Sequence, residues 1–160
     1  MLTYMMKILA IDTSCDDTCA SVLDNDRIIT NIVSSQIEIH KVWGGVVPNL
    51  AKRAHEEKID AVIAEALKVN PPLKKPSPAP SLDKEGKYIE EKFEDIDVIG
   101  VTVGPGLSPA LGVGVDKAKE LAKKYKKKLV AVNHIEAHLL SVSLKDENGE
   151  PKREIKLPAL

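Results

Sequence analysis

The stretch Lys7-Ile-Leu-Ala-Ile-Asp12, followed by Thr18-Cys-Ala-Ser-Val-Leu23 and by the segment from Arg27 to Ser34, decides the fold of this chain. Each piece is short and rich in aliphatic or β-branched residues, which predicts a strand. Polar residues separate the pieces at Thr13-Ser-Cys-Asp-Asp17 and at Asp24-Asn-Asp26, and such residues favour tight turns. The stretch therefore predicts three consecutive antiparallel strands.

Helices and strands alternate downstream of these three strands. Helices are predicted from Pro48 to about Val69 and from Ser108 to Lys126, and the apolar runs Asp97–Val103 and Lys128–Val132 predict buried strands. A last helix begins at His134. The order β-β-β-α-β-α-β-α predicts an α/β domain with a mixed sheet. This layout is similar to the ribonuclease-H-like lobe that occurs twice in the actin, sugar-kinase and Hsp70 superfamily.

The composition agrees with one domain of this class. Of the 160 residues, 43% are hydrophobic but only 3% aromatic, so the core must consist of aliphatic side chains. The net charge of -1 excludes a strongly basic nucleic-acid binder, although not a local basic patch. No apolar run reaches transmembrane length, and the first residues lack the pattern of a secretory signal. With two cysteines and no such signal, we expect a reduced, cytoplasmic protein without a membrane partner.

A Pro-rich and charged segment interrupts the predicted domain at about residues 70–95. Residues 70–81 contain five prolines with lysines and serines between them, and residues 83–95 are rich in charge. This composition predicts an exposed, extended insertion that has no core to join. We therefore expect one domain, residues 1–160, with an insertion at about 70–95.

Two predicted turns have residue types that are found in anion sites. Asp12 ends the first strand, and Thr13 and Ser14 follow it in a turn whose hydroxyls and amides can hold phosphate oxygens. Asp12 could orient a water molecule or a metal-bound phosphate. Gly104-Pro105-Gly106 lies between a strand and a helix, where glycines permit close backbone approach and the helix start offers amides to an anion. An ordinary polar turn is the simpler explanation of the first segment, and a plain strand-to-helix turn explains the second equally well.

His134 and His138 are four residues apart on a predicted helix that follows a buried strand. Two imidazoles at this spacing lie on one face and can bind one metal ion, although two separate polar positions explain the spacing equally well. Two ligands do not complete the coordination shell of zinc or iron. Glu136 lies about 200° around the helix from His134, which disfavours a metallopeptidase. His40 and His55 are isolated, and we expect surface or core roles for them.

Four short motifs follow one another along the chain. They are Asp12-Thr-Ser-Cys-Asp-Asp-Thr18, Gly44-Gly-Val-Val-Pro48, Gly104-Pro-Gly-Leu107 and His134-Ile-Glu-Ala-His138. Together they resemble the family of tRNA N6-adenosine threonylcarbamoyltransferases, from about Lys7 to the last residue apart from the insertion. The resemblance implies a two-lobed, actin-like enzyme that transfers threonylcarbamoyl from threonylcarbamoyl-AMP to N6 of adenosine 37 in tRNAs that read ANN codons.

The resemblance also implies roles for particular residues and partners. His134 and His138 would bind iron or zinc, and Thr13, Ser14, Gly104, Pro105 and Gly106 would line the cleft for the adenine nucleotide. We expect a catalytic role for Asp12, which stands where the family usually has the longer glutamate. Paralogous B-type and E-type subunits are the implied partners. The helix from Pro48 to Val69 is the expected contact with the B-type subunit, or with a second copy in a homodimer.

Family members are longer than this chain, which we therefore expect to be the N-terminal lobe with the C-terminal lobe absent. The missing lobe would supply the remaining metal ligands and a further nucleotide-binding loop, so the 160-residue chain would be inactive alone. Two alternatives stay open. One is a non-catalytic, actin-like scaffold subunit of the same pathway, and the other is a small-molecule kinase of the same superfamily. Neither the scaffold subunit nor a kinase of this superfamily has the histidine pair.

Overall fold

One mixed sheet organises the residues that the computed structural model describes, which are 6–68, 93–146 and 148–151. β1 pairs antiparallel with β2 and β2 with β3, whereas β4 runs parallel to both β1 and β5. The order across the sheet is β3-β2-β1-β4-β5. The mixed sheet predicted from the sequence is therefore confirmed. The strands are β1 (Lys7–Asp12), β2 (Asp17–Asp24), β3 (Arg27–Ser35), β4 (Val98–Gly104) and β5 (Lys128–Asn133).

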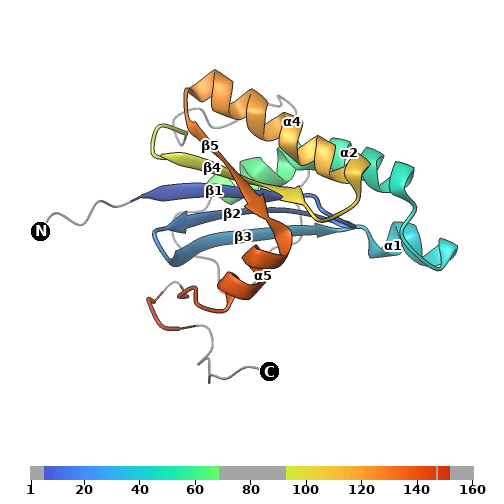
Figure 1. Cartoon of the computed structure of the whole chain (residues 1–160), viewed down its shortest axis with the longest axis horizontal. Coiled ribbons are helices and arrows are strands. Elements are labelled where there is room, and N and C mark those ends of the chain that lie inside the picture. Colours follow the sequence, from blue (N-terminus) through green and yellow to red (C-terminus); the bar gives the residue numbers. More distant parts are fainter. Residues whose placement is uncertain (1–5, 69–92, 147, 152–160) are drawn as a thin grey trace, which may run out of the picture.

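Two long helices, α2 (Pro48–Lys68) and α4 (Ser108–Tyr125), lie side by side along one face of this sheet (Figure 1). The shorter α5 (His134–Ser141) begins directly at the carboxyl end of β5. These helices agree with the predicted element order. None of the helices in the described ranges is long and apolar enough to cross a membrane. The sequence did not predict the short α1 (Ile37–His40) and the 3-10 turn η1 (Lys41–Trp43) that precede α2.

The core lies between the sheet and the two long helices. In β1, Leu9 and Ile11 point into it, and Val62 and Leu121 meet them from α2 and α4. Because side chains alternate along a strand, the intervening Ala10 and the terminal Asp12 belong to the opposite face. On that opposite face, the carboxyl end of β1 lies next to α5.

One aromatic pair completes this aliphatic core. Phe93 is fully buried and stacks on Tyr125, with ring centroids 4.1 Å apart. Of the insertion expected at about 70–95, residues 70–92 lie outside the described residues. Phe93 falls within the expected range but belongs to the core, and the exposed Glu94 and Asp95 beside it gave the segment its polar composition.

Candidate functional site

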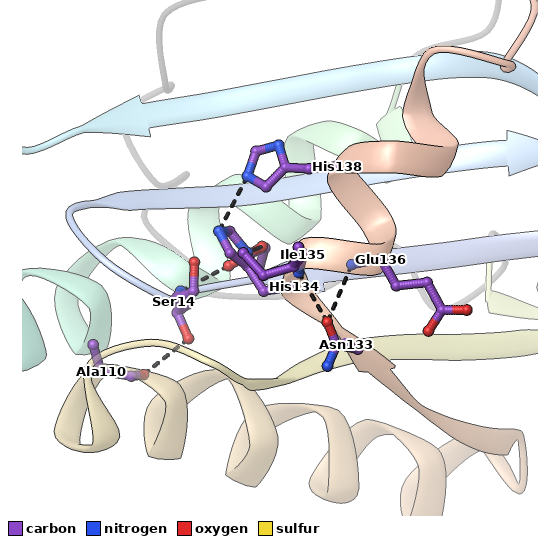
Figure 2. A network of polar contacts seen from close by, with 9 residues as sticks. Ser14, Ala110, Asn133, His134, Ile135, Glu136 and His138 are labelled. Atoms are coloured by element: carbon purple, nitrogen blue, oxygen red, sulfur yellow. Dashed lines mark hydrogen bonds and ion pairs between the residues drawn. The ribbon is translucent and has the colours of Figure 1, made fainter. Parts of the chain in front are cut away.

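Helix α5 owes its position to a side-chain cap. The carboxamide oxygen of Asn133 accepts hydrogen bonds from the amides of Ile135 and Glu136, at 3.0 and 3.1 Å (Figure 2). Asn133 is also the last residue of β5, so the cap fixes the first helical turn directly to the strand end. His134 is therefore the first helical residue, and His138 lies one turn above it.

The two imidazole rings face one another on this helix. Nε2 of His134 lies 3.1 Å from Nε2 of His138, and the ring planes are nearly perpendicular, at 87° (Figure 2). Figure 2 shows Glu136 pointing away from both rings, as its place on the helix predicted. The glutamate is thus not placed to act as the general base of a zinc peptidase.

Asp12 lies behind His134 and holds its other ring nitrogen. Oδ2 of Asp12 is 3.0 Å from Nδ1 of His134, and Oδ1 accepts a hydrogen bond of 2.7 Å from the amide of Ser14. Burial alone would raise the pKa of Asp12, but hydrogen bonds from Ser14, His134 and Thr102 outweigh it and hold that pKa below its ordinary value. The carboxylate is therefore ionised and can only accept, so Nδ1 of His134 is the donor.

The histidine pair fits two positions of a metal shell. Zinc binds imidazole nitrogen at about 2.0–2.1 Å, so two nitrogens that share one ion lie roughly 3 Å apart. The Nε2 atoms meet this requirement, and a carboxylate on the second ring nitrogen is the usual support of a histidine ligand. Among the residues described, no group of three or more His, Cys, Asp or Glu side chains could hold a metal ion. A complete shell would need ligands from beyond these residues.

The turn after β1 is locked onto helix α4 through Thr13. Its hydroxyl donates to the carbonyl of Ala110 at 2.9 Å and accepts from the amide of Gly114 at 3.2 Å. A Cβ at position 114 would lie 2.5 Å from that hydroxyl, which explains a glycine inside the helix. Thr13 is 1% exposed, so its side chain is fully used in holding the turn.

The loop after β4 comes equally close to the same turn. The amide of Leu107 donates to the carbonyl of Ser14 at 2.8 Å, and a Cβ at Gly106 would lie 2.5 Å from that oxygen. Glycine at 106 is therefore required by close packing of two backbones. The structure thus brings together the two segments predicted as a nucleotide site, Thr13–Ser14 and Gly104–Gly106. The amide of Leu107 bonds the carbonyl of Ser14 between them, whereas the hydroxyl of Thr13 bonds helix α4.

A hollow of about 170 Å³ opens beside Asp12. Small side chains make room for it, because glycine or alanine occupies several of the sheet positions there. Its walls come from β1, β2, β4, β5 and α5, so it adjoins the histidine helix. The lining residues are Ala10, Ile11, Asp12, Cys19, Ala20, Ser21, Gly100, Thr102, Val132 and Ala137.

His55 of α2 supports this site from the far side, which the sequence did not predict. Nδ1 accepts from the hydroxyl of Thr18 at 2.7 Å, and Nε2 donates to the carbonyl of Cys15 at 3.1 Å. Its ring is fully buried, as the helical spacing with Ala51 and Ile59 could have indicated. Burial lowers the pKa of His55, although the bond to Cys15 and nearby carboxylates oppose this, so the ring is neutral at pH 7.

The cysteines do not add to the donor set. Burial, together with the negative charges of Asp12 and Asp17, raises the pKa of Cys19 to about 12. Its thiol is therefore protonated at neutral pH, and neither cysteine belongs to a metal-binding group of three or more side chains in the described residues. Burial and Asp16 also raise the pKa of the exposed Cys15.

Comparison with solved structures agrees with this fold. YeaZ from Pseudomonas aeruginosa superposes with a TM-score of 0.50 at 17% sequence identity, over 81% of this chain and 44% of that one. A likeness at this identity concerns the fold alone. It agrees with the ribonuclease-H-like, actin-like class predicted from the order of helices and strands.

Comparison with known sequences identifies the family. The family model described as TsaD, tRNA N6-adenosine threonylcarbamoyltransferase, matches residues 27–71 and 80–155. The protein of that name from Clostridium novyi is 47% identical over 135 residues, which are 84% of this chain and 34% of that protein. The one from Pelagibacter ubique is 42% identical over 149 residues, 90% of this chain and 36% of that protein. The chain thus spans about a third of the length of these relatives. On the family match over most of its length, the chain belongs to the tRNA N6-adenosine threonylcarbamoyltransferase family.

Proposed function

We propose that this chain is the N-terminal, actin-like lobe of an enzyme that transfers threonylcarbamoyl from threonylcarbamoyl-AMP to N6 of adenosine 37 in ANN-decoding tRNA. One observation carries the proposal beyond the family match. The Nε2 atoms of His134 and His138 lie 3.1 Å apart, at the carboxyl end of a parallel strand. Ligands of α/β sheets bind at such strand ends.

His134 and His138 would hold one iron or zinc ion in this enzyme. When bound, the ion would position the threonylcarbamoyl group and polarise its carbonyl. The chain's own residues supply the surroundings. Ser14 and the loop Gly104–Gly106 lie against one another beside Asp12 and would form one wall of the cleft for the adenine nucleotide. The hollow at Asp12 is lined mostly by apolar side chains and has room for a small apolar group of the substrate.

We expect the 160-residue chain to be inactive without a second lobe. Two imidazoles leave the metal shell open, and no third side chain of the described residues is placed to complete a metal-binding group with them. The second lobe would close the shell and cover the nucleotide from the other side. Cytoplasmic tRNA would be the substrate, and paralogous B-type and E-type subunits would be the partners.

Helix α2 is the surface that we assign to the B-type subunit or to a second copy of this chain. One face of α2 packs on the sheet, and the other carries alternating charges that include Lys52 and Glu56, which pair at 3.6 Å. A groove between α2 and α4 is lined by further charged side chains, among them Asp60 and Lys117. A partner with complementary charges fits this surface.

The test joins this chain to the remaining two-thirds of the Clostridium novyi relative and supplies the B-type and E-type partner subunits, ATP, threonylcarbamoyl-AMP and tRNA. We expect threonylcarbamoyladenosine in the digested tRNA, measured by mass spectrometry. His134→Ala and His138→Ala should reduce the product to background, because each removes a metal ligand. Glu136→Gln is the matched control, since Glu136 lies on the same helix and points away from the pair.

Two outcomes would contradict the proposal. Undiminished product from His134→Ala would show that the pair does not serve the reaction. No product from the unaltered fusion, with partner subunits still bound to it, would favour the scaffold alternative.

A further inference from the structure

The orientation of the Asp12 carboxylate is set by a contact other than the one with His134. Its Oδ1 accepts a hydrogen bond from the amide of Ser14 at 2.7 Å. A backbone N–H can only donate a hydrogen bond, so the atom at the position of Oδ1 must be an acceptor. The remaining oxygen, Oδ2, then points to Nδ1 of His134 at 3.0 Å.

This contact decides which ring nitrogen of His134 carries the proton. An ionised carboxylate only accepts, so Nδ1 keeps its hydrogen and Nε2 presents a lone pair. That lone pair faces His138, whose Nε2 lies 3.1 Å away. For His138, no partner of Nδ1 is found in the described part of the chain, and the side chain is exposed. The two rings are therefore unequal, since only His134 is preset as a ligand.

We propose that Asp12 is a positioning residue, which acts on the reaction through His134 by holding the imidazole in the tautomer and orientation that bind metal. The inference rests on the proposed function, because it assumes that the histidine pair holds an ion. It differs from the expectation raised by the sequence, in which Asp12 itself contacted the reacting groups. Outer-shell partners of this kind typically change metal affinity 10- to 100-fold.

The substitution Asp12→Asn gives a sharp test because the backbone amide of Ser14 fixes the orientation of the new side-chain carboxamide. The amide oxygen must face the Ser14 amide, so the NH2 group faces Nδ1 of His134. Nδ1 then becomes the acceptor, and the proton moves to Nε2, where it blocks the metal. Asp12→Glu, by contrast, keeps a carboxylate and should keep the proton on Nδ1.

Two readouts follow this switch without any measurement of activity. Nitrogen-15 chemical shifts of the histidine rings report the tautomer in the metal-free chain, and titration of the two-lobe fusion described above with Zn²⁺ reports the metal affinity. We expect Nδ1–H in the unaltered chain and Nε2–H in Asp12→Asn, with about 10- to 100-fold weaker Zn²⁺ binding. Asp16→Asn is the control, since Asp16 lies in the same turn but hydrogen-bonds Cys15 instead.

The outcomes separate this inference from the proposed function. Absence of Zn²⁺ binding to the unaltered two-lobe fusion, in which the shell can close, would count against the metal role of the pair. Binding that Asp12→Asn leaves unchanged, or weakens no more than Asp16→Asn does, would overturn the role of Asp12 alone. The same holds if His134 of the unaltered chain carries its proton on Nε2, a result that needs no variant to fold.

Discussion

At the scale of single residues, the buried His55 makes stability depend on pH. Burial lowers its folded-state pKa below the ordinary value of 6.5, although the bond to Cys15 and the charges of Asp12, Asp16 and Asp17 oppose the shift. The neutral ring therefore contributes stability that is fully present above pH 6.5 and is lost as the pH falls toward the folded-state pKa. We expect the free energy of unfolding to decrease between pH 7 and pH 5.

Urea denaturation at both pH values measures this decrease, and His55→Gln provides the comparison because glutamine cannot take up the proton. The variant should lose the part of the pH dependence that His55 supplies. An NMR titration of the ring checks the cause directly in the unaltered chain. A His55 pKa at or above 6.5, or the same pH dependence in both proteins, would be inconsistent with this account.

At the scale of the element, α5 depends on its cap more than on the core. Asn133 bonds two amides of the first turn, and α5 has no buried residue. Loss of such a cap typically costs about 1 kcal/mol, and a short exposed helix can open locally. We expect Asn133→Ala to speed amide exchange in α5 about fivefold, while the exchange of β1 and β4 stays unchanged.

Hydrogen exchange followed by NMR measures this effect, and Asn31→Ala is the matched control. Asn31 is exposed on β3, so its loss should leave α5 unaltered. Equal acceleration in α5 and the central strands would show that the cap acts on global stability instead.

Single helices and strands are also the scale at which the sequence was most informative. The helices beginning at Pro48 and Ser108 agree with prediction because each repeats its apolar period several times, and the strand Lys7–Asp12 agrees because it is an unbroken apolar run. The four-residue α1 is too short to show a period. Phe93 was missed because one aromatic residue among charges has no pattern, and only its stacking on Tyr125 places it in the core.

The candidate site was predictable only in part, because sequence patterns report contacts between neighbouring residues and not between distant ones. The spacing of His134 and His138 indicated a shared helix face because both residues lie within one local period. The contact between Asp12 and His134 joins residues 122 positions apart, so it depends on the parallel arrangement of β1, β4 and β5. The supporting role of His55 likewise required knowing which turn lies over α2.

At the scale of the whole molecule, the proposed contact through α2 predicts how copies associate. Lys52→Glu would reverse a charge on the exposed face of α2, so an interface there that relies on charges paired between the two chains should weaken, by about tenfold if the reversal costs roughly 1.4 kcal/mol. Sedimentation equilibrium at low salt measures the dissociation constant. Lys119→Glu is the control, because it makes the same charge change at an exposed position of α4.

A second surface, on α5, is the alternative place where two copies could associate. Leu139 is 70% exposed on α5, and Ile135 and Leu140 are exposed beside it. Such apolar groups also promote association. If Leu139→Lys abolishes association and Lys52→Glu does not, the contact lies on α5 and the assignment to α2 is wrong.

The pairing of Asp12 with His134 joins the first strand of the fold to its last helix. During synthesis on the ribosome, the sheet can begin to assemble as soon as its early strands emerge. Under the proposed function, the two histidines and the carboxylate behind them come together only after residue 138 has left the exit tunnel and β5 has joined β4. Assembly of this part of the proposed site is therefore a late event in the life of the nascent polypeptide, and a product truncated ahead of α5 would retain the strands of the sheet yet lack both imidazoles.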